Sequence, residues 1–184
     1  MNEVTSQSPQ KARPIDDEVG QALAEMPYGM YIVGSRDGDD VNGMMADWVI
    51  QVSFVPRLVA VAVENDAKTV MNIRASQTFT VNLLAEDGMA LAARFAQPYF
   101  GSKVRGRAGA AAAEVHHKLE GVRYRLGETG CPILADALAW LECRVEALVP
   151  VGDHTLVVGR VLDGAAARDA GPLTSIITVW LYSG

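Results

Sequence analysis

The sequence predicts a mainly β protein, folded as an antiparallel barrel or sandwich with short helical additions. About seven strand-like runs stand against three or four short helical ones, and most successive strands follow one another without an intervening helix. A chain of 184 residues, 49% of them apolar, has enough material to bury one core. We therefore expect a polar, disordered tail over residues 1–14 and a single domain over residues 15–184.

The first predicted elements are a short helix and a strand. Residues 16–26 begin with acidic residues and place Val19, Leu23 and Met26 at helical spacing, and Pro27 ends the run. Residues 28–35, YGMYIVGS, predict a strand. The Gly- and Asp-rich segment 36–43 is expected to be a turn-rich connection.

Residues 42–63, NGMMADWVIQVSFVPRLVAVAV, are the most informative stretch. The first half alternates loosely, with Asp47 and Gln51 on one face of a predicted strand and Trp48 and Ile50 on the other. A face that mixes polar and apolar side chains suits the floor of a pocket, and an ordinary edge strand is an equal alternative. Residues 58–63 are fully apolar and predict a second strand.

The middle of the chain alternates between helix and strand and then loses its pattern. Residues 67–75 have helical spacing, residues 78–84 alternate and are rich in β-formers, and residues 87–95 predict another short helix. Residues 96–130 contain six glycines and a basic patch, KVRGR. We expect a long surface excursion there, with one short helix over residues 109–114.

The last third of the chain is rich in strands. Residues 137–149 predict a long strand that Pro150 ends, and residues 154–162 predict its hairpin partner. Residues 175–182, SIITVWLY, predict a final strand.

Composition and motifs exclude several kinds of site. A net charge of −6 opposes a general surface for nucleic acid or anionic membranes. The N-terminal residues show no secretory signal and no apolar run approaches bilayer length, so a cytoplasmic protein is expected. The chain has no phosphate-loop signature, HExxH or GxSxG motif. Cys131 and Cys143 form no CxxC pair, and His116–His117 has no third metal ligand at a suitable spacing. A bound cofactor that carries the chemistry itself is compatible with this inventory.

Three blocks together resemble the flavin reductase-like family, which includes short-chain flavin reductases and flavoredoxin. The block NGMMADWVIQVSFVPRLVAVAV is similar to the family's Gly-Met-Thr-Ala-Asn/Ser block with its following Val-Ser and proline pair. KTVMNIRASQTFTVNLL resembles its helix and Phe-x-Val-Asn-x-Leu strand, and PILADALAWLECRVEALVPVGDHTLVVGRV resembles its Leu-x-Cys and Gly-Asp-His hairpin. The similarity covers residues 27–184.

The resemblance implies a homodimeric, FMN-binding split β-barrel of antiparallel Greek-key type. Lys68 and Thr69 would lie near the flavin phosphate, and a cation beside a helix N-terminus also favours an anion on physical grounds. His154 would face the flavin or the nicotinamide. The plainer alternatives are a solvated Lys68, a core Phe79 and a hairpin-end His154 with no role. Carried over by position, the cofactor-binding residues are Asn42, Gly43, Met44, Met45, Ala46, Asp47, Trp48, Gln51, Val52, Ser53, Lys68, Thr69, Phe79 and Asn82.

The activity that the resemblance implies is NAD(P)H-dependent reduction of FMN, with FAD as the other candidate flavin. The hydride passes to flavin N5, which requires no side-chain acid or base, and reduced flavin would supply a monooxygenase component. Two other functions remain open: an FMN-holding electron carrier, and a non-catalytic dimer that has lost flavin. The chain departs from the family pattern at Met45, Asp47, Val55 and Arg57. An ionised Asp47 accepts hydrogen bonds but repels an anionic flavin, by a few kcal/mol at an effective dielectric near 20.

Overall fold

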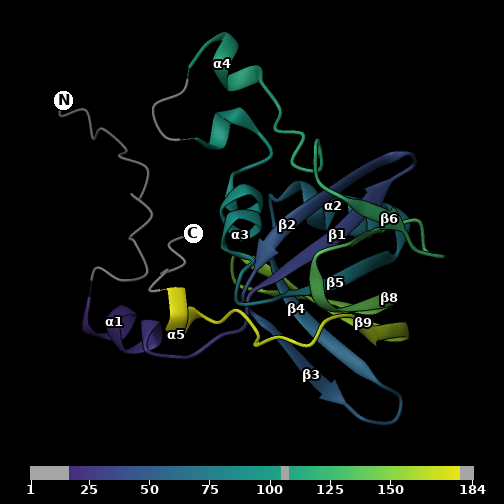
Figure 1. Cartoon of the computed structure of the whole chain (residues 1–184). Helices are drawn as coiled ribbons and strands as arrows, with labels where there is room; N and C mark the ends of the chain where they lie inside the picture. The colour runs from purple at the N-terminus through teal and green to yellow at the C-terminus, as the bar shows by residue number, and fades with distance from the viewer. Residues whose placement is uncertain (1–16, 105–107, 179–184) are drawn as a thin grey trace.

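The computed structural model describes residues 17–104 and 108–178, and it confirms the mainly antiparallel fold (Figure 1). Seven strands form one sheet in the order β2-β1-β5-β8-β9-β4-β3, and each neighbouring pair is antiparallel. These strands are β1 (Tyr31–Asp37), β2 (Asp40–Ala46), β3 (Val49–Ser53), β4 (Leu58–Glu64), β5 (Thr78–Leu84), β8 (Ala137–Val151) and β9 (His154–Ala166). A second sheet pairs β6 (Tyr124–Leu126) with β7 (Pro132–Leu134).

Among the described residues, four short helical segments lie in connections between strands, and one further helix lies before β1 and another after β9. They are α1 (Glu18–Ala24), α2 (Lys68–Ser76), α3 (Met89–Ala96), the 3₁₀ turn η1 (Gly101–Lys103), α4 (Ala110–Ala113) and α5 (Ser175–Thr178). α1 begins as its acidic first turn predicts, because the Asp17 side chain accepts a hydrogen bond of 2.7 Å from the Gly20 N–H. Within the described ranges, no helix is long and apolar enough to cross a bilayer.

The sheet curls because its two edge strands are joined by only two residues. β2 ends at Ala46 and β3 begins at Val49, although these strands lie at opposite ends of the strand order. The Ala62 N–H of β4 donates to the Trp48 carbonyl at 3.1 Å and ties the connection to the far edge. The two edges therefore meet at residues 47–48 in a barrel that is open beside this point.

Two clusters of buried side chains cover the two faces of β1, β2 and β5. The barrel cluster includes Val33, Val61 and Phe79, and α2 adds Val70 and Ile73. The outer cluster packs α3 and the segment near Leu173 on the other face, and its members include Met30, Ile32, Leu84, Phe95 and Leu134. Because both faces are covered, this part of the sheet gives β2 a fixed position from which to present side chains.

The predicted strand across residues 45–52 is wrong, because the chain changes partners in the middle of it. β2 pairs with β1 as far as Ala46, whereas β3 pairs with β4 from Val49 onward. The Val49 N–H donates to the Asp47 carbonyl at 3.0 Å, which makes a tight bend between the strands. Asp47 and Gln51 therefore do not share the face of one strand.

The other differences fall in connections and at the C-terminal end. Gly38 (φ 57°) lets β1 and β2 join through a tight turn, so the strands extend into the predicted connection. Pro150 does not end the long strand but lies inside β8, opposite Thr155 of β9. The pairing of β8 with β5 ends at Arg144, so at Pro150 the strand has no second neighbour that would require a backbone N–H. The excursion 96–130 contains an unpredicted strand, β6, which pairs with β7.

The described part of the predicted C-terminal strand is helical. Ser175–Thr178 form α5, and the Ser175 hydroxyl accepts from the Tyr28 N–H at 2.9 Å. This contact, with the reciprocal bond from the Ser175 N–H to the Tyr28 carbonyl, turns the chain away from the sheet despite its β-branched residues. Residues 179–182 of that prediction, and the tail over residues 1–14, lie outside the described residues.

Candidate functional site

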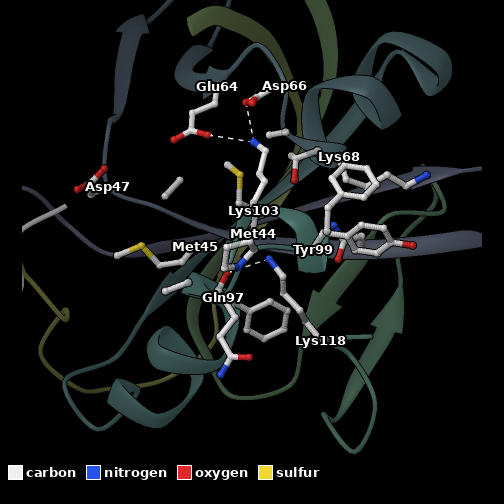
Figure 2. Close-up of a pocket in the computed structure, with 18 of the residues that line it drawn as sticks. Met44, Met45, Asp47, Glu64, Asp66, Lys68, Gln97, Tyr99, Lys103 and Lys118 are labelled. Carbon is white, nitrogen blue, oxygen red and sulfur yellow. Dashed lines mark hydrogen bonds and ion pairs between the residues drawn. The ribbon is translucent and has the colours of Figure 1, made fainter. Parts of the chain in front are cut away.

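A cavity of about 550 Å³ opens beside the meeting point of the two sheet edges (Figure 2). Its walls come from β2, from the turn between β4 and α2, and from the segment that runs from α3 through η1. Nine of the residues predicted to contact ligand line it: Asn42, Met44, Met45, Ala46, Asp47, Trp48, Lys68, Thr69 and His154.

Gly43 lies behind the pocket wall and lets Phe95 close against β2. A Cβ atom at Gly43 would lie 2.5 Å from the Phe95 ring, which is closer than packed carbon atoms approach. Phe95 lines the cavity from α3. Gly43 therefore shapes the cavity through its packing against Phe95, whereas the resemblance placed Gly43 itself in contact with the flavin.

Asn42 is a buried amide that lines the cavity and has no hydrogen-bond partner among the described residues. Its residue is 2% exposed, and neither Nδ2 nor Oδ1 is bonded. An unsatisfied buried amide group costs about 1–3 kcal/mol. A ligand that offers both a donor and an acceptor would remove that cost.

The N-terminus of α2 also opens onto the cavity. Ala67, its N-cap residue, makes no capping bond through a side chain, and both Lys68 and Thr69 line the cavity. The Lys68 ammonium lies 3.2 Å from Asp40 and 5.8 Å from the centre of the Tyr99 ring. Free N–H groups at a helix start, with a cation beside them, are suited to a phosphate.

Asp47, Trp48 and His154 gather where the sheet edges meet. The Trp48 and His154 rings lie 5.1 Å apart, and His154 Nδ1 lies 2.6 Å from Asp153 Oδ1. Burial raises the pKa of Asp47, while its own N–H, the Trp48 N–H and the His154 charge act in the opposite direction. Arg57 does not line the cavity. The positive charge that lowers the pKa of Asp47 is that of His154.

Two lysines that the sequence reading missed enter the cavity from the excursion 96–130. Lys103 Nζ lies 2.6 Å from Asp66 and 3.5 Å from Glu64, which ties η1 to the turn before α2 (Figure 2). Lys118 is 5% exposed and donates to the Phe95 carbonyl at 3.1 Å. The basic segment KVRGR could have indicated Lys103 as a site residue, whereas no sequence pattern distinguished Lys118.

Gln51, Val52 and Ser53 lie outside the cavity. They belong to β3, which with part of β4 extends away from the body of the sheet (Figure 1). Gln51 donates to the Ser53 carbonyl at 3.2 Å within that hairpin. Val55, at the hairpin tip, does not line the cavity either.

Phe79 and Asn82 were predicted beside the flavin, and the structure instead buries both in the core. Phe79 is fully buried, and its ring fills the space where a side chain at Gly159 would lie. The Asn82 amide bonds the Ile32 and Pro132 carbonyls and the Leu134 N–H. Asn82 therefore fixes β7 against the main sheet, and neither residue lines the cavity.

The cysteines and histidines outside the cavity form no further site in the described residues. Both thiols are buried, and burial raises the pKa of Cys143 to about 12, which makes it a poor nucleophile. Among the described residues, no group of three His, Cys, Asp or Glu side chains could hold a metal ion.

The sequence matches the flavin reductase like domain family over residues 23–177. A similar curated protein is the ferric-chelate reductase (NAD(P)H) of Archaeoglobus fulgidus, 31% identical over 156 residues that cover 84% of this chain and 85% of that protein. The high molecular weight rubredoxin of Moorella thermoacetica is also 31% identical over 156 residues. The chain spans 62% of that rubredoxin and only 26% of a diflavin flavoprotein of Synechocystis.

Solved structures share the fold at comparable identity. The NADH:FAD oxidoreductase SgcE6 of Streptomyces globisporus C-1027 superposes with a TM-score of 0.72 at 26% identity, over 91% of this chain and 88% of that one. The nitrilotriacetate monooxygenase component B homologue of Mycobacterium thermoresistibile gives 0.69 at 26% identity, over 83% and 78%. These neighbours share the split-barrel arrangement of the strands.

Proposed function

Because this chain belongs to the flavin reductase like domain family, we propose that it is an NAD(P)H:flavin oxidoreductase that binds FMN in the cavity described above. The unpartnered amide of Asn42 is the observation that carries the proposal. It lies in the wall of a cavity that also contains the α2 N-terminus, so one ligand with a polar ring and an anionic end satisfies both.

The chain's own residues bind and orient the reactants. Asn42 would bond the polar edge of the flavin ring, and the α2 N-terminus with Lys68 and Thr69 would hold the phosphate. Trp48 and His154 form an aromatic wall for the nicotinamide. Flavin bound here supplies N5 as the hydride acceptor, and NAD(P)H supplies the hydride. Met44, Met45 and Phe95 exclude water from the site.

The test is nicotinamide oxidation by the purified protein. We expect NADH or NADPH consumption to depend on added FMN, FAD or riboflavin, and FMN titration to give saturable binding. Absence of both flavin binding and nicotinamide oxidation would leave the non-catalytic dimer as the better description. Tight flavin with slow nicotinamide oxidation would favour the electron carrier instead.

Ferric-chelate reduction is a second candidate function. It is favoured by the Archaeoglobus relative, which is matched over 85% of its length and is named for that activity. Assays of the purified protein with NAD(P)H and a ferric chelate, with and without FMN, distinguish ferric-chelate reduction from flavin reduction. Iron reduction that needs no added flavin and exceeds flavin reduction would support this candidate.

We also infer a cytoplasmic homodimer that passes reduced flavin to a monooxygenase component. The β3–β4 hairpin supports the dimer, because its apolar side chains are exposed in one copy of the chain. The monooxygenase component rests on the neighbour that is named as component B of nitrilotriacetate monooxygenase. Coupled hydroxylation by a purified oxygenase partner, with and without this protein, tests the second inference.

A further inference from the structure

Lys118 differs from the other two lysines of the cavity in having no carboxylate partner among the described residues. Lys68 pairs with Asp40, and Lys103 pairs with Asp66 and Glu64. Lys118 is almost fully buried, yet among the described residues its ammonium donates only to the uncharged Phe95 carbonyl. A buried ammonium is costly unless a negative charge and further acceptors surround it.

The backbone of Lys118 is held in place from α3. Arg94 Nε donates to the Lys118 carbonyl at 2.6 Å, and the Arg94 guanidinium also bonds the Glu120 carbonyl. Lys118 enters the cavity from the side opposite Glu64 and Asp66, with its ammonium directed inward (Figure 2). The chain thus fixes a desolvated cation inside a cavity, which is the preorganised arrangement that favours an anionic ligand.

We propose that Lys118 is a ligand-binding residue whose ammonium forms an ion pair with an anionic group of the bound flavin. The inference rests on the proposed function, and it adds a residue that the sequence resemblance did not supply. Flavin offers two such groups: the 5′-phosphate of FMN, and the ring itself when reduction leaves it negatively charged.

The charge state of Lys118 makes this interaction dependent on pH. Desolvation lowers the pKa of Lys118 to about 8, and an anion bound beside it raises that pKa again. Affinity for the anion therefore falls as the pH rises through about 8, where the empty site loses its proton. The charged or titratable groups that face the cavity or contact Lys118 are Lys103 from η1, Tyr99 from the segment before η1, Lys68 from α2, Glu64 from the end of β4, Asp66 from the turn before α2, Asp47 after β2, His154 from β9, and Arg94 from α3.

The first test compares neutral and anionic flavins on Lys118→Gln, with Lys118→Arg as the variant that keeps the charge. Dissociation constants are measured for riboflavin and FMN, each oxidised and reduced. A loss for FMN that exceeds the loss for riboflavin by roughly tenfold identifies the phosphate. A loss that is greater for reduced than for oxidised riboflavin identifies the ring. Equal losses for all four ligands, or none, overturn the proposal, and Lys118→Arg should retain most of the affinity.

The second test measures the pKa of Lys118 by NMR, with and without flavin. The chain has four lysines, so ¹³C-methylated protein gives few signals, and the Lys118 signal is the one absent in Lys118→Gln. We expect it to titrate near pH 8 in the empty protein and at higher pH with saturating FMN. An unchanged titration with FMN bound overturns the Lys118 inference alone. Failure of wild-type protein to bind any flavin overturns the proposed function as well.

Discussion

At the scale of single residues, we expect the unpartnered amide of Asn42 to lower the stability of the empty protein and to strengthen ligand binding. We expect Asn42→Leu, which has nearly the same shape, to leave the empty protein as stable as the wild type or more stable by about 1–2 kcal/mol, because an unsatisfied buried amide disappears. The same change should weaken FMN binding by about tenfold. Urea unfolding without ligand and fluorescence titration with FMN measure the two effects.

Asn82→Leu is the matched control, because Asn82 is equally buried and fully bonded. Its loss leaves the Leu134 N–H without its acceptor and removes the amide bond to the Ile32 carbonyl, so we expect a destabilisation of about 2 kcal/mol or more. Similar stability losses in the two variants would contradict the idea that the Asn42 amide is reserved for a ligand.

Asp47 introduces a second pH dependence, which has the same origin as that of Lys118, because burial disfavours the charged form of each side chain. Burial raises its pKa in the folded chain above the ordinary 3.8, so over that interval the folded chain holds a proton that the unfolded chain has released. Stability therefore falls as the pH rises from 3.8 through the raised folded pKa, and it is constant beyond. Asp47→Asn should be more stable than the wild type at pH 7, and the difference should vanish below pH 3.8.

The same variant bears on flavin affinity. Removing the Asp47 charge from the cavity should raise the affinity for FMN, because an ionised carboxylate repels an anionic ligand. Urea unfolding at several pH values and FMN titration at pH 7 are the measurements. A less stable Asn variant at pH 7 would show that the carboxylate has a favourable bond that outweighs its burial.

At the scale of elements, the Lys103 ammonium joins η1 to the end of β4 and the turn before α2. We expect Lys103→Gln to speed FMN release several-fold, since Lys103 joins η1 to Glu64 and Asp66 across the pocket wall. Global stability should change by less than about 1 kcal/mol, as is usual for ion pairs near the surface. Stopped-flow displacement of FMN gives the rate.

Arg160→Gln supplies the control for Lys103→Gln. It removes an ion pair with Glu146 at 2.9 Å on β8 and β9, and neither partner lines the cavity. An equal acceleration of FMN release in this variant would show that loss of any ion pair, and not of the η1 fastening, is responsible.

Elements that depend on local pattern were predictable from the sequence, and those that depend on distant partners were not. β5 occupies residues 78–84 as predicted, because its alternation and β-forming residues are intrinsic to it. The break between β2 and β3 at residues 47–48 could not be predicted, because the apolar alternation of the sequence continues across it and only the partner strand changes. The helical Ser175–Thr178 likewise follows from a bond to Tyr28.

The candidate site was predictable where it is contiguous in the sequence. Residues 42–48 and the start of α2 reach the cavity together, and the resemblance identified them. Lys118 enters from a segment whose course is set by bonds from Arg94 to main-chain carbonyls, which no spacing reveals. The sequence left Phe79 open between the core and a flavin contact, because a core aromatic and a ligand-stacking aromatic look the same in a strand pattern, and the structure buries its ring.

At the scale of the whole molecule, the β3–β4 hairpin exposes more apolar surface than one copy can cover. Phe54 is 83% exposed and Ile50 66% exposed, on a projection that extends from the sheet (Figure 1). Such a surface in water favours association. We expect the wild type to sediment as a dimer, and Ile50→Lys with Phe54→Lys to shift it toward the monomer.

Leu126→Lys provides the control for the hairpin variant, because Leu126 is an exposed apolar residue on β6, outside the hairpin. It should leave the sedimentation coefficient unchanged. Cavity and hairpin share the meeting point of the sheet edges at residues 47–48, so dissociation should also weaken FMN binding. A monomeric wild type, or a hairpin variant that stays dimeric, would place the subunit contact elsewhere and remove the link between assembly and binding.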